Sequence, residues 1–321
     1  KALPASARLG CNFINAYRAL ESIMKKVDRR TGKPESSVTA YTSVPERLLT
    51  CLYDSSSDSQ SQALYCAGFE LQEWRCDAFA DHIMDWLADY ALLEDELKVS
   101  HTNMYVRLRE AAARIYTSDK YQKRGELGEV VLHAICRDFF ETIPLAPRVF
   151  YLTASNDVVK SFDIAHVRYL SEGAFELWLG EAKFFQDAGE AMNSAIESVK
   201  AHIDAGFLKN EELLLGPQIS KSVPYYDEIR ALFSPNSSID KLFKTAAFPI
   251  LIAADSKAAA NGTSQDAHYI ASARAELVKL EAKLKASGLR EKIRILLIYV
   301  PVKSKDDLAV AFDKRLKGLQ A

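Results

Sequence analysis

The sequence predicts an α/β fold, in which a mixed β-sheet is flanked by helices and preceded by a mostly helical N-terminal region. Apolar runs of strand length occur at residues 175–185, 248–254 and 293–302. Between them lie longer segments whose apolar residues recur every three or four positions, as they do on one face of a helix. Strands that alternate with helices in this way are typical of α/β domains.

Composition and charge restrict the classes of function. The chain has 321 residues, of which 48% are apolar and 26% are charged, as in an ordinary globular domain. Its formal net charge of −2 argues against nucleic-acid binding over the whole surface, so such contacts would need a local basic patch or a partner. No apolar run is long enough to span a membrane. Five scattered cysteines without a Cys-x-x-Cys pair indicate reduced thiols, and we expect a cytoplasmic protein.

The sequence suggests a division of the chain at residue 60. Residues 1–60 are predicted to form an N-terminal extension or small module, because turn-rich, polar sequence with a serine-rich stretch ends there. Residues 61–321 are predicted to form a helical lead-in and the main domain. The core of that domain covers about 105–302, with a helical insertion at about 208–246.

Two charged residues interrupt the most apolar of the predicted strands. Within Phe175–Phe185, Glu181 and Lys183 are two residues apart, so in a strand their side chains leave the same face. Gly180 precedes them and allows another group to approach the backbone closely. Burying a carboxylate and an ammonium costs free energy unless they pair or bind an ion. The pair therefore marks either a site or a simple ion pair at a sheet edge.

Another acidic residue interrupts a strand pattern shortly upstream. Asp163 lies within the strand-like segment 158–170, and the residues 171–175 that follow, with Gly173, are predicted to form a hairpin turn. Pairing of the two strands would bring Asp163 close to Glu181. Taken alone, Asp163 is also consistent with a turn or edge residue.

The helix predicted at 124–136 carries two further carboxylates. Glu126 and Glu129 are three residues apart and therefore lie near one helical face. Clustered carboxylates stay ionised together only if a cation neutralises them. Oxygen ligands suit Mg²⁺ or Mn²⁺, which retain several waters and bind substrate phosphates. A lysine beside such an ion can orient or deprotonate an attacking water, or offset charge on the phosphate.

The order of these residues resembles the pattern of the PD-(D/E)xK nuclease superfamily. That pattern is matched by Gly125-x-x-x-Glu129 on a helix, then Asp163, then Glu181-Ala-Lys183. Phe162 stands where a proline often precedes the aspartate. The tripeptide Glu-x-Lys is common by chance, so the ordered set carries the resemblance.

Three segments, 124–129, 162–166 and 179–183, resemble more narrowly the HamA-type family. That family comprises the nuclease subunits of Hachiman-like bacterial antiphage systems, which usually act with a helicase. The similarity covers roughly residues 85–300.

The resemblance implies a restriction-endonuclease-like core and a set of catalytic residues. Asp163 and Glu181 would be the main ligands of Mg²⁺ or Mn²⁺, and Glu129 a direct or water-mediated one. Lys183 would act on the nucleophilic water, and hydrolysis would leave a 5′-phosphate. A helicase partner encoded nearby would deliver the DNA, in keeping with the near-neutral charge.

Several neighbouring residues compete for supporting roles. Glu126 competes with Glu129, which we prefer because it matches the helix pattern of the superfamily and lies beyond the less fixed first turn. Glu126 and His133 are candidates for residues that contact the metal ligands rather than the metal itself. His133 is equally a candidate core histidine. His166 lies three residues from Asp163 and therefore on the opposite face of the strand.

Four residues are candidates for contact with DNA. Lys123 and Arg124 precede the motif helix, and Asn193 and Lys200 lie on the polar face of the helix predicted at 187–207. A solvated face is the alternative. The buried face of the later helix is predicted to carry Ala188, Ala191, Ala195, Val199, His202 and Ile203.

The rest of the chain adds elements but no second site. Ser264 is expected to cap one of the helices and Gly288 to end it. Gly216–Ser222 is superficially similar to a phosphate-binding loop but lacks the second glycine and a preceding strand, so no bound nucleotide cofactor is expected. The remaining predicted elements are helices at 62–97, 106–116, 264–286 and 306–319 and strands at 148–153, 248–254 and 293–302.

The leading hypothesis is a metal-dependent DNA nuclease that serves as the effector of an antiphage system together with a helicase. One alternative is a nuclease-fold module that binds DNA or a partner without cutting. Another is a nuclease that acts on RNA, because nothing in the sequence reports contacts to a 2′-hydroxyl.

Overall fold

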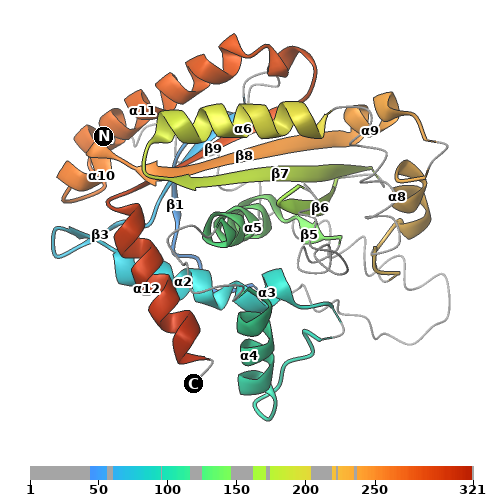
Figure 1. Cartoon of the computed structure of the whole chain (residues 1–321), viewed down its shortest axis with the longest axis horizontal. Coiled ribbons are helices and arrows are strands. Elements are labelled where there is room, and N and C mark those ends of the chain that lie inside the picture. Colours follow the sequence, from blue (N-terminus) through green and yellow to red (C-terminus); the bar gives the residue numbers. More distant parts are fainter. Residues whose placement is uncertain are drawn as a thin grey trace, which may run out of the picture.

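A seven-stranded sheet forms the middle layer of the molecule, and helices cover both of its faces (Figure 1). This architecture confirms the predicted α/β class with a mixed sheet. The computed structural model describes residues 44–55, 61–94, 96–115, 125–145, 162–170, 174–203, 219–221, 223–234 and 237–319.

The sheet is parallel in the middle and antiparallel at both ends. Its strand order is β1-β2-β9-β8-β7-β6-β5, in which β2, β9, β8 and β7 are parallel to one another. β1, β6 and β5 each pair antiparallel with their neighbours. The strands are β1 (Thr50–Ser55), β2 (Gln62–Cys66), β5 (Ile143–Pro144), β6 (Ile164–Tyr169), β7 (Phe175–Phe185), β8 (Ala246–Asp255) and β9 (Ile295–Val302), and a separate hairpin contains β3 (Phe69–Glu70) and β4 (Glu73–Trp74).

The central strands have helices on both sides and carry the core. Every residue of β9 is buried, and so is every residue of β8 except Asp255. Strands covered on both faces are expected to be apolar along their whole length rather than in alternation. The two continuous apolar runs predicted from the sequence are therefore confirmed.

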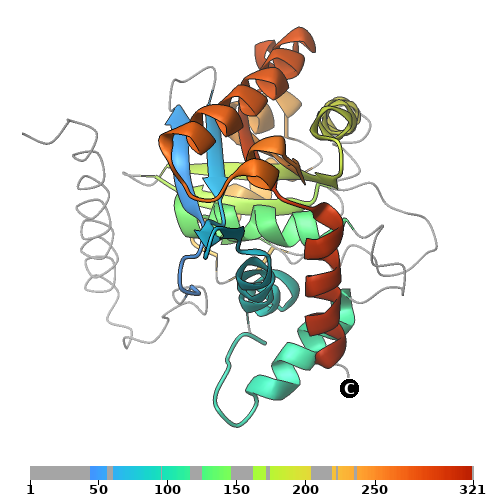
Figure 2. The ribbon, with the colours of Figure 1, turned by 90° about the vertical axis from the view of Figure 1, so that its left-hand side faces the viewer.

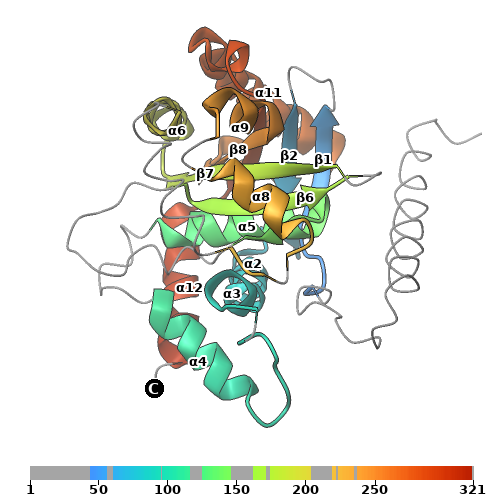
Figure 3. The ribbon, with the colours of Figure 1, turned by 90° about the vertical axis from the view of Figure 1, so that its right-hand side faces the viewer.

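Two layers of helices enclose the sheet. Helices α6 and α11 lie on one face, and α5 lies on the other with α2, α3 and α12 beyond it (Figure 1). In side view α4 extends away from the sheet (Figure 3). The helices are α2 (Cys76–Asp85), α3 (Leu87–Ala91), α4 (Met104–Ile115), α5 (Glu126–Phe140), α6 (Ala188–His202), α8 (Tyr226–Leu232), α9 (Ile239–Thr245), α10 (Lys257–Asn261), α11 (Ala267–Ala286), the 3₁₀ turn η7 (Leu289–Glu291) and α12 (Lys305–Gly318).

The N-terminal part departs from the prediction. The helical pattern predicted at 62–97 begins instead with β2, which pairs with β9, and continues through β3 and β4 before α2 starts. A short apolar run cannot be assigned to helix or strand by periodicity alone, and here the pairing with β9 decides. β1 lies within residues 1–60, predicted as an extension, yet it pairs with β2 in the main sheet. The division of the chain at residue 60 stays a prediction.

The sheet is strongly twisted. At one edge β1 and β2 run at a steep angle to β6 and β7 near the opposite edge (Figure 2). Helix α12 packs against α2, where Arg315 contacts both Asp77 and Asp81.

No helix of the described ranges is sufficiently long and apolar to cross a membrane.

Helix α11 begins two residues later than the sequence suggested. Its N-cap is Asp266, whose side chain accepts a hydrogen bond from the Tyr269 amide at 2.8 Å, and Ser264 donates to that carboxylate instead. Gly288 follows the helix with a φ of 71°, as a helix stop requires. The predicted strand at 148–153, most of the turn at 171–175 and most of the Gly216–Ser222 segment lie outside the described residues.

Two glycines allow α5 to lie close to β7. A Cβ on Gly180 would come within 2.6 Å of Ile164 Cγ1 and 2.9 Å of Leu132 Cδ2, distances that real side chains do not reach. A Cβ on Gly128 of α5 would lie 3.1 Å from the Cβ of Phe184. The even-numbered residues of β7 in this region therefore face α5, and Glu181 and Lys183 face the other side.

Candidate metal centre

The β6–β7 hairpin places Asp163 opposite Glu181. Ile164 pairs with Gly180, so the residue before Ile164 faces the residue after Gly180. The Asp163 amide donates to the Gly180 carbonyl at 2.8 Å, which extends the ladder to this point. Opposite residues of antiparallel strands have Cα atoms about 4.5–5.5 Å apart and side chains on the same face. The structure thus brings these two predicted ligands together.

The carboxylate of Asp163 lies where the two strands part. β7 continues beyond the start of β6, and the Ala182 amide donates to Asp163 Oδ2 at 2.7 Å. Without this contact the amide would lack the strand partner that a buried N–H requires. The side chain of Asp163, which is 6% exposed, is therefore fixed by its own neighbouring strand.

Glu181 is buried between a lysine and a histidine. Its residue is 3% exposed, and its Oε1 accepts a hydrogen bond from Lys183 Nζ. Its Oε2 lies 3.3 Å from Nδ1 of His202, the last residue of α6. The Lys183 side chain is 17% exposed, so the ammonium lies between the buried carboxylate and solvent.

Glu129 is held by a different part of the fold. It lies in the first turn of α5 and is 7% exposed. Its Oε2 accepts a hydrogen bond of 2.5 Å from the hydroxyl of Tyr90 on α3. Helix α5, which carries Glu129, covers the face of the sheet opposite α6 (Figure 1).

His133 belongs to a buried polar network that joins α3, α5 and β6. Its Nε2 lies 2.8 Å from Asp89 Oδ2, and its Nδ1 lies 3.1 Å from Nε2 of His166. His166 Nδ1 in turn lies 2.8 Å from the hydroxyl of Thr142. Arg137 donates both to Asp89 and to the Thr142 carbonyl. His133 therefore contacts this network and not the carboxylates of β6 and β7.

The charges of this network follow from its burial. Burial lowers the pKa of His133 and lowers that of His166 well below its ordinary value, so both rings are neutral. Burial raises the pKa of Asp89, but the hydrogen bond from His133 and the charge of Arg137 outweigh it and leave that pKa below its ordinary value. When both rings are neutral, Nε2 of His133 donates to Asp89, and Nδ1 of His133 accepts from Nε2 of His166. Nδ1 of His166 then accepts from the hydroxyl of Thr142.

The residues around Glu181 fit a hard divalent cation. Oε2 of Glu181 is buried and accepts no hydrogen bond of good geometry from the described residues. Mg²⁺ is often held by one or two carboxylates, with water and substrate phosphate completing its shell. Across the described ranges, however, no three His, Cys, Asp or Glu side chains are grouped so as to hold a metal ion. A metal at this place would rest on Asp163 and Glu181, and the role of Glu129 as a ligand stays a prediction.

Comparison with known protein families identifies the family of the chain. The HamA family model matches residues 43–316, which is most of the chain and includes all of the predicted site. The chain belongs to the HamA family. HamA is the nuclease-like family of Hachiman antiphage defence, as the sequence resemblance implied. Searches of curated proteins and of solved structures gave no match.

The candidate DNA contacts of this HamA chain are only partly described. Asn193 is exposed on α6 and its Oδ1 accepts a hydrogen bond from Lys283 of α11 at 3.1 Å, so it faces a neighbouring helix. Lys200 is exposed on the same helix. Lys123 and Arg124 lie outside the described residues. Glu126 is half-buried in the first turn of α5.

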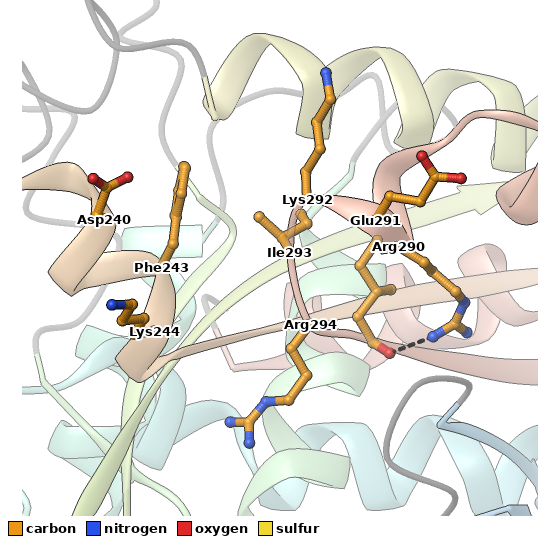
Figure 4. Close-up of a pocket in the computed structure, with 9 residues that line it drawn as sticks. Asp240, Phe243, Lys244, Arg290, Glu291, Lys292, Ile293 and Arg294 are labelled. Carbon is orange, nitrogen blue, oxygen red and sulfur yellow. Dashed lines mark hydrogen bonds between the residues drawn. The ribbon is translucent and has the colours of Figure 1, made fainter.

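A pocket of about 670 Å³ lies apart from the predicted site residues, between α9 and the start of β9 (Figure 4). Lys244 and Lys292 are exposed beside it. Its two arginines are already paired, Arg290 with Glu281 and Arg294 with Glu176. Because two carboxylates also line this pocket in the HamA chain, it has no clear surplus of positive charge for a phosphate. Its lining residues are Asp240, Phe243, Lys244, Arg290, Glu291, Lys292, Ile293, Arg294 and Ile295.

Two residues that contact the site were not assigned a role from the sequence, His202 and Tyr90. His202 was visible as a polar residue on the otherwise apolar face of a helix, which is a usable signal. Tyr90 gave no signal, because a tyrosine is a normal residue in an apolar helical stripe.

Proposed function

We propose that this HamA-family chain is a metal-dependent nuclease that hydrolyses phosphodiester bonds of DNA. The observation that supports the proposal is the placement of Asp163 opposite Glu181 on paired strands, with the ammonium of Lys183 against Glu181. Family membership independently associates the chain with antiphage defence.

Each residue has a role that its position permits. Asp163 and Glu181 supply carboxylate oxygens for Mg²⁺ or Mn²⁺ at the point where β6 and β7 part. Such an ion, when bound, lowers the pKa of a bound water and stabilises the leaving oxygen. Lys183, which lies between Glu181 and solvent, can turn towards a phosphate, offset its developing charge and orient the attacking water.

Plasmid and linear DNA with Mg²⁺ provide the direct test. We expect the parent to cut and Lys183→Ala, Asp163→Asn and Glu181→Gln to lose at least about a hundredfold in rate, the usual effect of removing one electrostatic stabiliser. Lys314→Ala, an exposed lysine on α12, is the matched control and should cut like the parent. Equal cleavage by all five proteins would refute the assignment.

A module that binds without cutting is the second candidate, because Lys183 pairs with Glu181 and no three-acid group is present among the described residues. Calorimetric titration with Mn²⁺ separates the two candidates. Heat that disappears in both Asp163→Asn and Glu181→Gln supports the nuclease, whereas no heat in the parent supports the module. Parallel assays on single-stranded RNA and tRNA decide between DNA and RNA as substrate.

The proposed biological role is that of an effector that works with a helicase. The near-neutral charge of the chain supports a partner that delivers the nucleic acid. Phage plaque assays in bacteria that express the chain with a helicase encoded beside it test this role. Protection that persists with Lys183→Ala would show that cleavage by this chain is not the defence.

A further inference from the structure

His202 occupies a position on α6 that the helical pattern assigns to apolar side chains. The buried stripe of this helix runs through Ala191, Ala195 and Val199, and His202 continues it three residues later. The residue is only 5% exposed. A buried imidazole costs free energy unless its polar atoms find partners. Its presence at this position therefore calls for a specific polar contact.

The imidazole lies beside the carboxylate of Glu181. Nδ1 of His202 is 3.3 Å from Oε2, within ion-pair distance but without the geometry of a hydrogen bond, whereas Lys183 contacts Oε1. The ring of Phe162 packs against the imidazole with centroids 4.8 Å apart and an angle of 65° between the planes. Phe162 immediately precedes Asp163, so the imidazole contacts the chain beside both carboxylate-bearing residues.

We propose that His202 is a positioning residue that orients the carboxylate of Glu181 for a divalent cation. The inference rests on the proposed function, because it concerns the same metal site. When Lys183 turns towards a water or a phosphate, its contact with Glu181 is loosened. Once the ammonium turns away, His202 is the contact that still limits rotation of a carboxylate whose terminal torsion is intrinsically broad.

The expected loss of metal affinity on replacing His202 can be estimated from the usual effect of removing a residue that orients a metal ligand. Loss of a group that orients a metal ligand typically lowers metal affinity or activity about 10- to 100-fold. His202→Leu removes the polar atom and keeps the bulk. His202→Asn keeps a side-chain nitrogen close to the position of Nδ1 and should restore most of the orientation.

Calorimetric titration of the full chain with Mn²⁺ is the first measurement. We expect His202→Leu to weaken Mn²⁺ affinity about 10- to 100-fold and His202→Asn to stay within about threefold of the parent. His82→Leu is the matched control, because His82 of α2 is also buried, at 4% exposed, but accepts its hydrogen bond from Trp86, which directly follows that helix. Parent-like affinity in His202→Leu, or equal losses in His202→Leu and His82→Leu, would overturn the proposal.

A second measurement does not depend on metal or cleavage. Urea unfolding of the parent, His202→Leu, Glu181→Gln and the double variant measures the coupling between the two side chains. We expect clearly non-additive shifts of the unfolding midpoint, and additive shifts would overturn the positioning contact. If the parent binds no Mn²⁺, the proposed nuclease function fails, and this cycle alone decides whether His202 orients Glu181.

Discussion

Replacing Gly180 by alanine tests the closeness of α5 to β7, on which the candidate site depends. The added Cβ would lie 2.6 Å from Ile164 Cγ1, 2.9 Å from Leu132 Cδ2 and 3.0 Å from Ile164 Cδ1. All three contacts are shorter than packed carbon atoms allow, and the two neighbours come from different elements. Relief of these contacts requires other rotamers of both neighbours in a buried position, or a shift of β6 or α5.

The expected loss of stability can be bounded. Adding a methyl group to a well-packed core costs about 1–3 kcal/mol. Alanine also restricts the unfolded chain more than glycine does, which returns roughly 0.5–1 kcal/mol. Because the closest contact is only 2.6 Å, the upper part of the first range applies, about 2–3 kcal/mol, and we expect Gly180→Ala to lower the free energy of unfolding by about 1–2.5 kcal/mol. Because the Gly180 carbonyl accepts from the Asp163 amide, Mn²⁺ affinity should fall as well.

Urea unfolding followed by far-UV circular dichroism measures the change. Gly318→Ala is the control, since a Cβ at that position would meet nothing within 4 Å, and it should be neutral or stabilising by up to about 1 kcal/mol. The double variant Gly180→Ala/Ile164→Ala should lose less than the sum of its parts, because Ile164→Ala removes the closest atoms. Unchanged or increased stability of Gly180→Ala would refute the close packing and with it the position of α5.

Three further predictions concern the polar network and Tyr90. Tyr90→Phe should cost about 1–3 kcal/mol, because the buried carboxyl group of Glu129 loses a hydrogen bond, and an unchanged urea midpoint would contradict that contact. Asp89→Asn should cost about 3–5 kcal/mol, because it removes a carboxylate that pairs with the buried guanidinium of Arg137, and a loss below about 1 kcal/mol would contradict the pairing. Burial lowers the pKa of His166 in the folded chain, so below about pH 6.5 the unfolded chain binds more protons and stability should fall between pH 7 and 5. His166→Asn should reduce that slope, and an equal slope in unfolding measured at each pH would contradict the assignment.

Local sequence was enough to predict the elements of the motif. The helix α5, the hairpin of β6 and β7 and the buried strands β8 and β9 follow from strong periodicity or from long apolar runs. The facing of Asp163 and Glu181 follows as well, because side chains alternate along a strand and a hairpin fixes the register.

The features that the sequence missed depend on contacts between distant segments. β2 is a strand because β9 lies beside it, and nothing within Gln62–Cys66 reports that neighbour. The cap of α11 is Asp266 and not Ser264, a choice between two capping residues that propensity does not distinguish. The partners of His133 were unpredictable for the same reason, since Asp89 lies 44 residues away on another helix.

The position of each carboxylate relative to the sheet predicts how strongly its replacement should weaken metal binding. Asp163 and Glu181 share a face and a hairpin, whereas Glu129 lies on a helix of the opposite face and is bound to Tyr90. Its Oε2 accepts the hydrogen bond of Tyr90, so ligation of a metal through that oxygen would require the hydrogen bond to be shared or broken. Glu129→Gln should therefore weaken Mn²⁺ affinity by less than about tenfold, while Asp163→Asn and Glu181→Gln weaken it by at least about a hundredfold, as expected for direct ligands compared with supporting groups. An equal loss in all three variants, measured by calorimetry, would mean that Glu129 is a full ligand.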